Sequence, residues 1–209
     1  NYMRHEIKIP FKDDFNSYFS DWKDFKHKIS KPYEDRYINS MYYDDDEFSL
    51  AQDNLAGISN RKKYRVRWYN DSKDYYNYEI KIKKNNLGKK NILKTNQKIS
   101  HFDNLYSLKN SFLREPQNSF FLNNFDNLDL KPKLKVSYLR SYYVYEGVVR
   151  LTFDRNLSYK LFNKFDLKNN SIRDNMSVLE LKFKPEYLHL VHKLIKNSKF
   201  IPKRFSKYL

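Results

Sequence analysis

The chain has 209 residues, of which 41 are Lys or Arg and 25 are Asp or Glu, so its net charge is +16. The absence of cysteine excludes disulfide scaffolds, cysteine metal sites and thiol catalysis. No apolar run approaches the roughly 20 residues that span a bilayer, and no signal-like segment opens the sequence, so a cytoplasmic location is expected. With 18% aromatic residues and only 3 glycines, the composition argues against disorder and against glycine-rich phosphate loops.

The first third of the chain predicts four strands and a helix. Polar and apolar residues alternate over residues 4–11, which predicts a strand. Asp13 and Asp14 then open an amphipathic helix whose apolar face runs from Phe15 to Phe25. Before Gly57, a short segment is predicted as helical or irregular. The other three strands are predicted over residues 37–43, 63–69 and 76–83.

The rest of the chain begins with a polar stretch and then returns to strand patterns. Residues 85–127 are rich in asparagine and weakly periodic, which predicts an insertion with helices at 102–112 and after Pro116 rather than a separate domain. Strands are predicted over 134–145, 148–154 and 178–183, with a hairpin at Glu146–Gly147 and a last helix that begins near Pro185. Together, six to eight mostly antiparallel strands predict a single α+β domain over residues 1–209 around a curved or closed sheet.

The same kind of tripeptide, Glu-x-Lys with Ile or Leu in the middle, occurs in three predicted strands. Because side chains alternate along a strand, each Glu shares a face with its Lys. The strand over 63–69 places Arg65 and Arg67 on one face in the same way, and Arg61 and Lys63 extend that face. The tripeptides are Glu6-Ile7-Lys8, Glu79-Ile80-Lys81 and Glu180-Leu181-Lys182.

These charged faces have two possible interpretations. In an open sheet they form a solvated surface of cross-strand ion pairs, each worth under ~1 kcal/mol. In a closed sheet they line a barrel, whose interior then suits a polyanion and a metal ion. Other charged groups are interpreted as solvated: the acidic turn Asp44–Glu47, and a loop with Lys84, Lys89 and Lys90.

The predicted strands and the end of the chain carry, in order, Glu6-x-Lys8, Arg65 to Tyr69, Glu79-x-Lys81, Tyr138 to Arg140, Arg150 to Asp154, Glu180-x-Lys182 and Phe205 to Tyr208. This series resembles the VTC (vacuolar transporter chaperone) domain of the CYTH, or triphosphate tunnel metalloenzyme, superfamily. The resemblance covers about residues 4–208. It implies a closed antiparallel β-barrel, or tunnel, of about eight strands with flanking helices. It also implies an enzyme that transfers the terminal phosphate of ATP to a growing polyphosphate chain, with Mn²⁺ or Mg²⁺.

The resemblance also implies roles for individual residues. The catalytic phosphate-binding set would be Lys8, Arg65, Arg67, Lys81, Arg140 and Arg150. Further phosphate ligands would be Arg61, Lys63, Tyr138 and Lys182, and Arg204, Ser206 and Lys207 would close over one end of the tunnel. Arg4 stands where the superfamily has the first glutamate of its first strand. The principal metal ligand is therefore expected to be Glu180, with Glu6 and Glu79 as further candidates.

ATP and polyphosphate are the expected partners, whereas nucleic acid is not, and the oligomeric state is left open. No protein nucleophile is required, because the acceptor is itself a phosphate oxygen. One alternative is a triphosphatase or nucleoside triphosphate hydrolase with the same tunnel, in which water is the acceptor. Another is a non-catalytic protein that binds polyphosphate or nucleic acid. The implied end group Arg204, Ser206 and Lys207 favours the polymerase.

Overall fold

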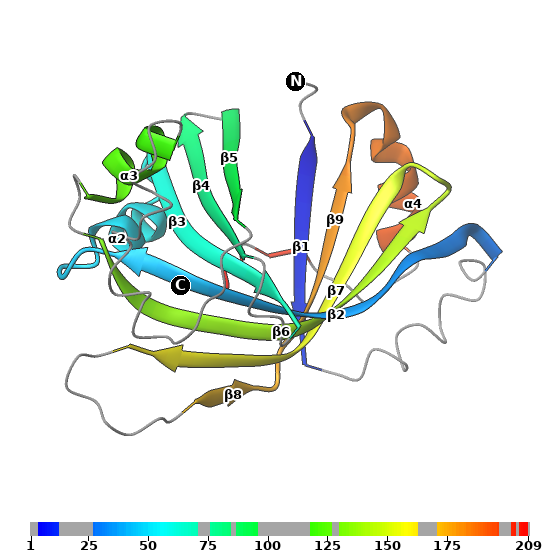
Figure 1. Ribbon diagram of the computed structural model, residues 1–209. Helices are drawn as coiled ribbons and strands as arrows, with labels where there is room; N and C mark the ends of the chain where they lie inside the picture. Colours follow the sequence, from blue (N-terminus) through cyan, green and yellow to red (C-terminus); the bar gives the residue numbers. More distant parts are fainter. Residues whose placement is uncertain are drawn as a thin grey trace. The chain divides into compact units, whose positions relative to one another are not determined.

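The computed structural model describes residues 4–12, 27–70, 76–84, 87–95, 118–126, 130–162, 171–196, 202–203 and 205–208. They form an antiparallel sheet with a few helices (Figure 1). The pairing order is β1-β9-β7-β6-β2-β3-β4-β5, and β8 pairs with β7. The strands are β1 His5–Phe11, β2 Ile29–Asp44, β3 Asn60–Tyr69, β4 Tyr76–Lys84, β5 Leu87–Thr95, β6 Lys131–Tyr145, β7 Val149–Leu161, β8 Ile172–Asp174 and β9 Ser177–Phe183.

This arrangement confirms the predicted α+β fold with an antiparallel sheet of about eight strands. The hydrogen-bonded path through the described strands has β1 and β5 as its ends, so closure into a tunnel stays a prediction. The predicted hairpin between β6 and β7 is confirmed as well. Glu146 and Gly147 at its tip have φ values of 49° and 70°, which is the left-handed pair that a tight two-residue turn requires.

The chain divides into two compact units, and the long strands β2, β6 and β7 contribute residues to both. Each unit has a helix-covered apolar side and a charged side, because apolar and charged residues alternate along its strands. Unit 1 consists of Asn1–Tyr37, Tyr138–Ser158 and Arg173–Ser206, and unit 2 consists of Ile38–Ser137, Tyr159–Ile172 and Lys207–Leu209.

In unit 1, the apolar side of the sheet packs against α4 (Leu188–Lys196). The 3₁₀ turn η4 (Pro185–Tyr187) precedes this helix, and Pro185 suits a first turn because it has no N–H to leave unpaired. Val191 and Leu194 of α4 are buried against the strands. The strand residues of this core are Ile9, Phe11, Tyr145, Val149, Leu151, Phe153, Leu179, Leu181 and Phe183.

In unit 2, the apolar side belongs mainly to β3 and β4, and the helices α2 (Ser49–Ala56) and α3 (Ser119–Asp126) contribute to it. Leu50 of α2 and Phe121 of α3 pack against this core. The other buried residues are Met41, Tyr43, Tyr64, Val66, Trp68, Tyr76, Tyr78, Ile80 and Leu130. The charged side chains of the same strands must therefore lie on the opposite face.

The acidic turn before α2 differs from its sequence interpretation as a solvated turn. Asp44 is fully buried, and its Oδ1 accepts hydrogen bonds from the N–H groups of Asp45 and Leu50 at 3.0 Å. Oδ2 of Asp44 accepts the N–H of Ala51 at the same distance. The buried carboxylate therefore satisfies backbone donors at the start of α2, where a helix has unpaired N–H groups and favours negative charge.

The predicted strand over residues 37–43 was too short, because β2 begins eight residues earlier. The alternation begins at residue 37, but the strand begins at Ile29 and includes Pro32. Pro32 is tolerated because β3 pairs only with residues 38–43 of β2, which leaves the first half of the strand without a neighbour on that side in the described sheet. Asp35 of this half binds Arg155 of β7, with 2.7 Å between Oδ2 and Nη2.

Two further elements fall within residues 85–127. β5 is a strand of the sheet where the sequence showed only a polar insertion, and α3 agrees with the helix predicted after Pro116. The helices predicted over 15–25 and 102–112 lie outside the described residues. Among the helices that the structure does describe, none has the length and apolar character needed to cross a membrane.

Candidate functional site

A strongly basic surface covers the side of unit 2 that faces away from its core. Arg65 of β3 lies opposite Glu79 of β4, and Lys81 of β4 lies opposite Lys90 of β5. This register and the alternation along each strand bring the charged residues of three strands onto one side. The surface, called the basic face below, comprises Arg61, Lys63, Arg65, Arg67, Lys81, Lys83, Lys90 and Lys94, with Glu79 as the one carboxylate on β3, β4 and β5.

Glu79 lies between two cations of the basic face. Its Oε2 accepts a hydrogen bond from Arg65 Nε, and its Oε1 lies 2.8 Å from Lys90 Nζ. Only 3% of its side chain is exposed. Burial alone would raise the pKa of Glu79, but the charges of Arg65, Arg67 and Lys90 lower it to about 2, so it is ionised at neutral pH. Lys90 is therefore part of the sheet and of an ion pair, which corrects its interpretation as a solvated loop residue.

Within β3, β4 and β5, a single carboxylate of the basic face stands against its eight cations. The pKa of Lys90 is lowered by burial and by the nearby Arg65 and Arg67, despite the attraction of Glu79. Lys83 and Lys94 form no ion pair within the described residues. Such an excess of like charge repels itself, and a bound polyanion would relieve the repulsion. The basic face thus has the electrostatic character of a phosphate-binding surface.

The end of the chain is anchored beside the basic face within unit 2. The Tyr208 hydroxyl donates a short hydrogen bond to Asp44 Oδ2, and its ring stacks on that of Tyr42 with 4.9 Å between centroids. Tyr42 in turn lies opposite Arg65 in the β2–β3 pairing. This anchor holds Lys207, one of the predicted end residues, close enough for its charge to influence the Tyr42 hydroxyl. The sequence analysis assigned no role to Tyr42 or Tyr208, because strand alternation alone does not show the register of β2 against β3.

Unit 1 carries a second charged surface, opposite the side covered by α4. Lys8 of β1 and Thr152 of β7 both pair with Glu180 of β9, and Arg150 of β7 pairs with Lys182. Acidic and basic groups are nearly balanced here, unlike on the basic face. This surface, called the mixed face below, comprises Glu6, Lys8, Tyr138, Arg140, Arg150, Thr152, Asp154, Glu180 and Lys182.

Arg140 is the most strongly held cation of the mixed face. Its Nε and Nη2 donate to the two oxygens of the fully buried Asp154 at 2.5 and 2.7 Å, and Nη2 lies 3.9 Å from Glu180 Oε2. Burial opposes the charged form, but Asp154 raises the pKa of Arg140 well above its ordinary value. The sequence analysis missed Asp154, which stood only at the end of a strand motif. The structure shows that it fixes the orientation of a predicted phosphate ligand.

Two carboxylates of the mixed face lie close together around lysine ammonium groups. Lys182 Nζ is 2.5 Å from Glu180 Oε1 and 3.9 Å from Glu6 Oε2. Lys8 Nζ is 3.0 Å from Glu6 Oε1. Burial would raise the pKa of Glu180, but Lys182, Lys8 and Arg140 lower it to about 2. Glu6 and Glu180 thus lie side by side and stabilise the positive charges next to them.

The same residues fit the divalent metal that the tunnel family implies. The buried Thr152 Oγ1, on the strand position opposite Glu180, has no hydrogen-bond partner in the part of the chain that the structure describes. Mg²⁺ is usually held by one or two carboxylates together with substrate phosphates, so Glu180 and Glu6 suffice as protein ligands. The third candidate, Glu79, lies in unit 2 and, like Glu180 and Glu6, is paired with neighbouring cations, here Arg65 and Lys90. Across the described ranges, no three His, Cys, Asp or Glu side chains converge on one point.

The remaining predicted site residues differ in their surroundings. Arg61 Nη1 donates to the carbonyl of Ile58 at 2.6 Å, and Arg67 is buried with its Nε 3.3 Å from Ser40 Oγ. Lys81 and Arg150 have exposed side chains. Arg204 lies outside the described residues.

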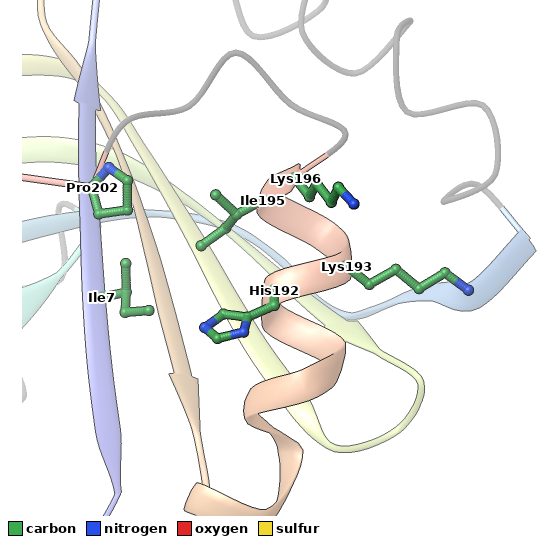
Figure 2. Close-up of a pocket in the computed structure, with 6 residues that line it drawn as sticks. All are labelled: Ile7, His192, Lys193, Ile195, Lys196 and Pro202. Carbon is green, nitrogen blue, oxygen red and sulfur yellow. The ribbon is translucent and has the colours of Figure 1, made fainter.

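A cavity of about 500 Å³ lies elsewhere in unit 1, on the side of β1 that carries α4 (Figure 2). In Figure 2, His192 and Ile195 of α4 point toward Ile7 of β1 and toward Pro202, while Lys193 and Lys196 extend away from the strand. Ile7 faces away from Glu6 and Lys8, so this cavity is separate from the mixed face. Its mainly apolar lining lacks the carboxylate and arginine groups that phosphate chemistry needs.

Comparisons with known proteins extend these observations. The chain is 12% identical to a proposed adenylate cyclase from Vibrio parahaemolyticus, with a TM-score of 0.53 over 98% of this chain and 95% of that one. A proposed adenylyl cyclase from Hippeastrum, described as having a dominant triphosphatase activity, is also 12% identical, with a TM-score of 0.58 over 99% and 93% of the two chains. A proposed adenylate cyclase from Bacillus halodurans, again 12% identical, gives 0.54 over 97% and 96%.

At such low identity these structures show a shared fold, which is that of the CYTH-like triphosphate tunnel proteins. No curated protein sequence matches the chain. The family model of the VTC domain matches residues 5–209, which is nearly the whole sequence. The two charged faces and the strand motifs lie within this match, and the chain belongs to the VTC domain family.

Proposed function

We propose that this protein is a metal-dependent polyphosphate polymerase, which transfers the terminal phosphate of ATP to a growing polyphosphate chain. The observation that carries the proposal is the basic face of a VTC domain, where eight cations stand against one carboxylate on three adjacent strands. A chain of phosphates is the ligand class that matches such an extended row of cations. The use of ATP fits the expected cytoplasmic location.

The basic residues act by positioning phosphates and neutralising their charge. Phosphoryl transfer needs little covalent help from a protein, so its rate depends on alignment and on stabilisation of the developing charge. Arginine binds phosphate oxygens through a planar fork of N–H donors, whereas lysine supplies a compact charge. The proposed phosphate ligands are Lys8, Arg61, Lys63, Arg65, Arg67, Lys81, Tyr138, Arg140, Arg150, Lys182, Arg204, Ser206 and Lys207.

The carboxylates have separate tasks in this proposal. Glu180 and Glu6 hold Mn²⁺ or Mg²⁺, which when bound supplies further neutralisation of phosphate charge. Asp154 keeps the guanidinium of Arg140 in place through its two hydrogen bonds. Glu79 orients Arg65 on the basic face, since its two oxygens bind Arg65 and Lys90.

A triphosphatase is the second candidate, in which water replaces the phosphate chain as acceptor. The observation in its favour is the fold shared with the Hippeastrum protein, which is described by its dominant triphosphatase activity. Both reactions use the same phosphate ligands and the same metal, so they differ in product rather than in site. Incubation of the purified protein with ATP and Mn²⁺ or Mg²⁺ separates them. A polymerase yields long polyphosphate on a gel, whereas a hydrolase yields only free phosphate.

The variant Glu180→Gln tests the metal assignment and the enzyme proposal together. Loss of one ligand charge should abolish turnover and leave tripolyphosphate binding intact, because the phosphate ligands are unchanged. Glu186→Gln is the matched control. Glu186 is an exposed carboxylate of η4 that, like Glu180, lies near a lysine, with 3.6 Å between its Oε1 and Lys184 Nζ. Unchanged turnover in Glu180→Gln would refute the metal assignment. Binding without any turnover in the unaltered protein would indicate a non-catalytic polyphosphate binder.

A further inference from the structure

Tyr42 occupies an unusual position for a buried tyrosine. It lies on the charged side of β2, opposite Arg65, and only 7% of its surface is exposed. Its neighbour Tyr43 points to the other side and belongs to the unit 2 core. Tyr42 is thus a phenol placed among the cations of the basic face.

Among the described residues, the hydroxyl of Tyr42 accepts a hydrogen bond but does not donate one. Arg65 Nη1 donates to its oxygen at 3.2 Å, and no acceptor for the phenol proton lies among the described residues. The Tyr208 ring stacked on Tyr42 at 4.9 Å fixes the ring plane and so limits where the proton can point. A buried donor without an acceptor is costly, and most buried polar groups have a partner. Bound ligand is the natural source of the missing acceptor.

The charges around this hydroxyl specify what kind of acceptor suits it. The groups that face it are Arg65 and Arg67 on β3 and Lys207 beside Tyr208. Burial raises the pKa of Tyr42, but these three cations outweigh burial and lower it to about 8. An anionic acceptor suits this environment better than a neutral one, because the three cations attract negative charge. A phosphate oxygen held by Arg65 would lie beside the phenol proton.

We propose that Tyr42 is a further substrate-binding residue, whose hydroxyl donates a hydrogen bond to a phosphate oxygen of ATP or polyphosphate on the basic face. Tyr208 is its positioning residue, because the hydrogen bond to Asp44 fixes the ring that stacks on Tyr42. This inference rests on the proposed function, since it concerns the same phosphate-binding surface. It adds a neutral donor to a set of ligands that is otherwise mainly cationic.

The test compares Tyr42→Phe with Tyr43→Phe. Both changes remove one hydroxyl from β2 and keep the ring, but they do so on opposite sides of the strand. The measurement is the dissociation constant of tripolyphosphate at pH 6.5 by titration calorimetry. Loss of a hydrogen bond to a charged group should weaken binding by about tenfold to a hundredfold in Tyr42→Phe. Tyr43→Phe should bind as the unaltered protein does.

A second measurement at pH 9 excludes a purely structural effect. Above pH 8 the Tyr42 hydroxyl loses its proton, so it can no longer donate and it adds a negative charge. The advantage of the unaltered protein over Tyr42→Phe should then disappear, whereas the titration of tripolyphosphate itself affects both proteins equally. Equal affinities of the unaltered protein and Tyr42→Phe at pH 6.5 would refute the role of Tyr42 and leave the proposed function standing. A difference between them that persists unchanged at pH 9 would do the same. If the unaltered protein does not bind tripolyphosphate at all, the proposed function is wrong and the inference falls with it.

Discussion

Replacement of Glu79 by glutamine removes the one carboxylate from the three strands of the basic face. The folded protein lowers the pKa of Glu79 from 4.5 to about 2, despite the burial that opposes its ionisation. Each pKa unit corresponds to about 1.4 kcal/mol, so the charged form stabilises the fold at pH 7 by about 3 kcal/mol. Loss of one partner from a buried ion pair typically costs about 3 to 5 kcal/mol, which agrees.

The pH dependence of this loss follows from the direction of the shift. Because the folded pKa lies below the unfolded one, the stabilisation is fully present above pH 4.5 and is lost as the pH falls toward 2. At pH 3 only about 1.4 kcal/mol remains. The difference in unfolding free energy between the unaltered protein and Glu79→Gln should therefore shrink by about half between pH 7 and pH 3.

Urea unfolding at both pH values measures these differences, and Glu186→Gln serves as the control for the loss of an exposed carboxylate. The control should differ from the unaltered protein by less than about 0.5 kcal/mol at either pH. A Glu79→Gln variant as stable as the control at pH 7 would show that Arg65 and Lys90 do not depend on Glu79. A loss of equal size at both pH values would show that packing rather than charge causes it.

Three further outcomes are expected. Tyr208→Phe should lower the unfolding free energy by about 2 kcal/mol, because it removes one of the hydrogen bonds that the buried Asp44 accepts; calorimetric melting checks this, and an unchanged melting temperature contradicts it. Gly147→Ala should lower the unfolding free energy by about 1 kcal/mol, because Gly147 has a φ of 70°, which alanine adopts only with strain. Gly88→Ala is the control and should leave the unfolding free energy unchanged, since no atom lies near the added methyl group. Equal effects of the two changes in denaturant unfolding would contradict the turn assignment. Tripolyphosphate at a hundredfold excess over its dissociation constant should stabilise the protein by about 2.7 kcal/mol, and the absence of a melting shift would argue against the basic face as a phosphate site.

Strand alternation was sufficient to predict the charged residues that β3, β4 and β9 contribute to the two faces. The strands around Arg65, Glu79 and Glu180 lie within three residues of their predicted bounds, since each alternates apolar core residues with polar or charged ones. The VTC resemblance depended on the same motifs, and the family match over residues 5–209 confirms it. Where one face of a strand is buried and the other charged, a period of two is a reliable signal.

The parts that escaped prediction depend on pairing between distant segments. Lys90 was placed in a loop because β5 has no apolar alternation, yet its backbone pairs with β4 and its ammonium binds Glu79. The first half of β2 contains Pro32 and four charged residues, so it lacks the strand alternation, but β6 pairs with this strand. Asp44 was interpreted as solvated because a run of acidic residues favours a solvated turn, whereas its hydrogen bond from Tyr208 comes from the far end of the chain. In each case tertiary contacts outweigh local preference.

The same half of β2 has a consequence for how copies of the protein behave in solution. Because β3 stops short of it, its outer row of backbone groups is an open edge in the described sheet, and another chain could add a strand there. Pro32 removes one donor from this strand, and Lys31, Glu34, Asp35 and Arg36 place charges along it. The irregularity that hid the strand from sequence analysis thereby discourages aggregation through this edge.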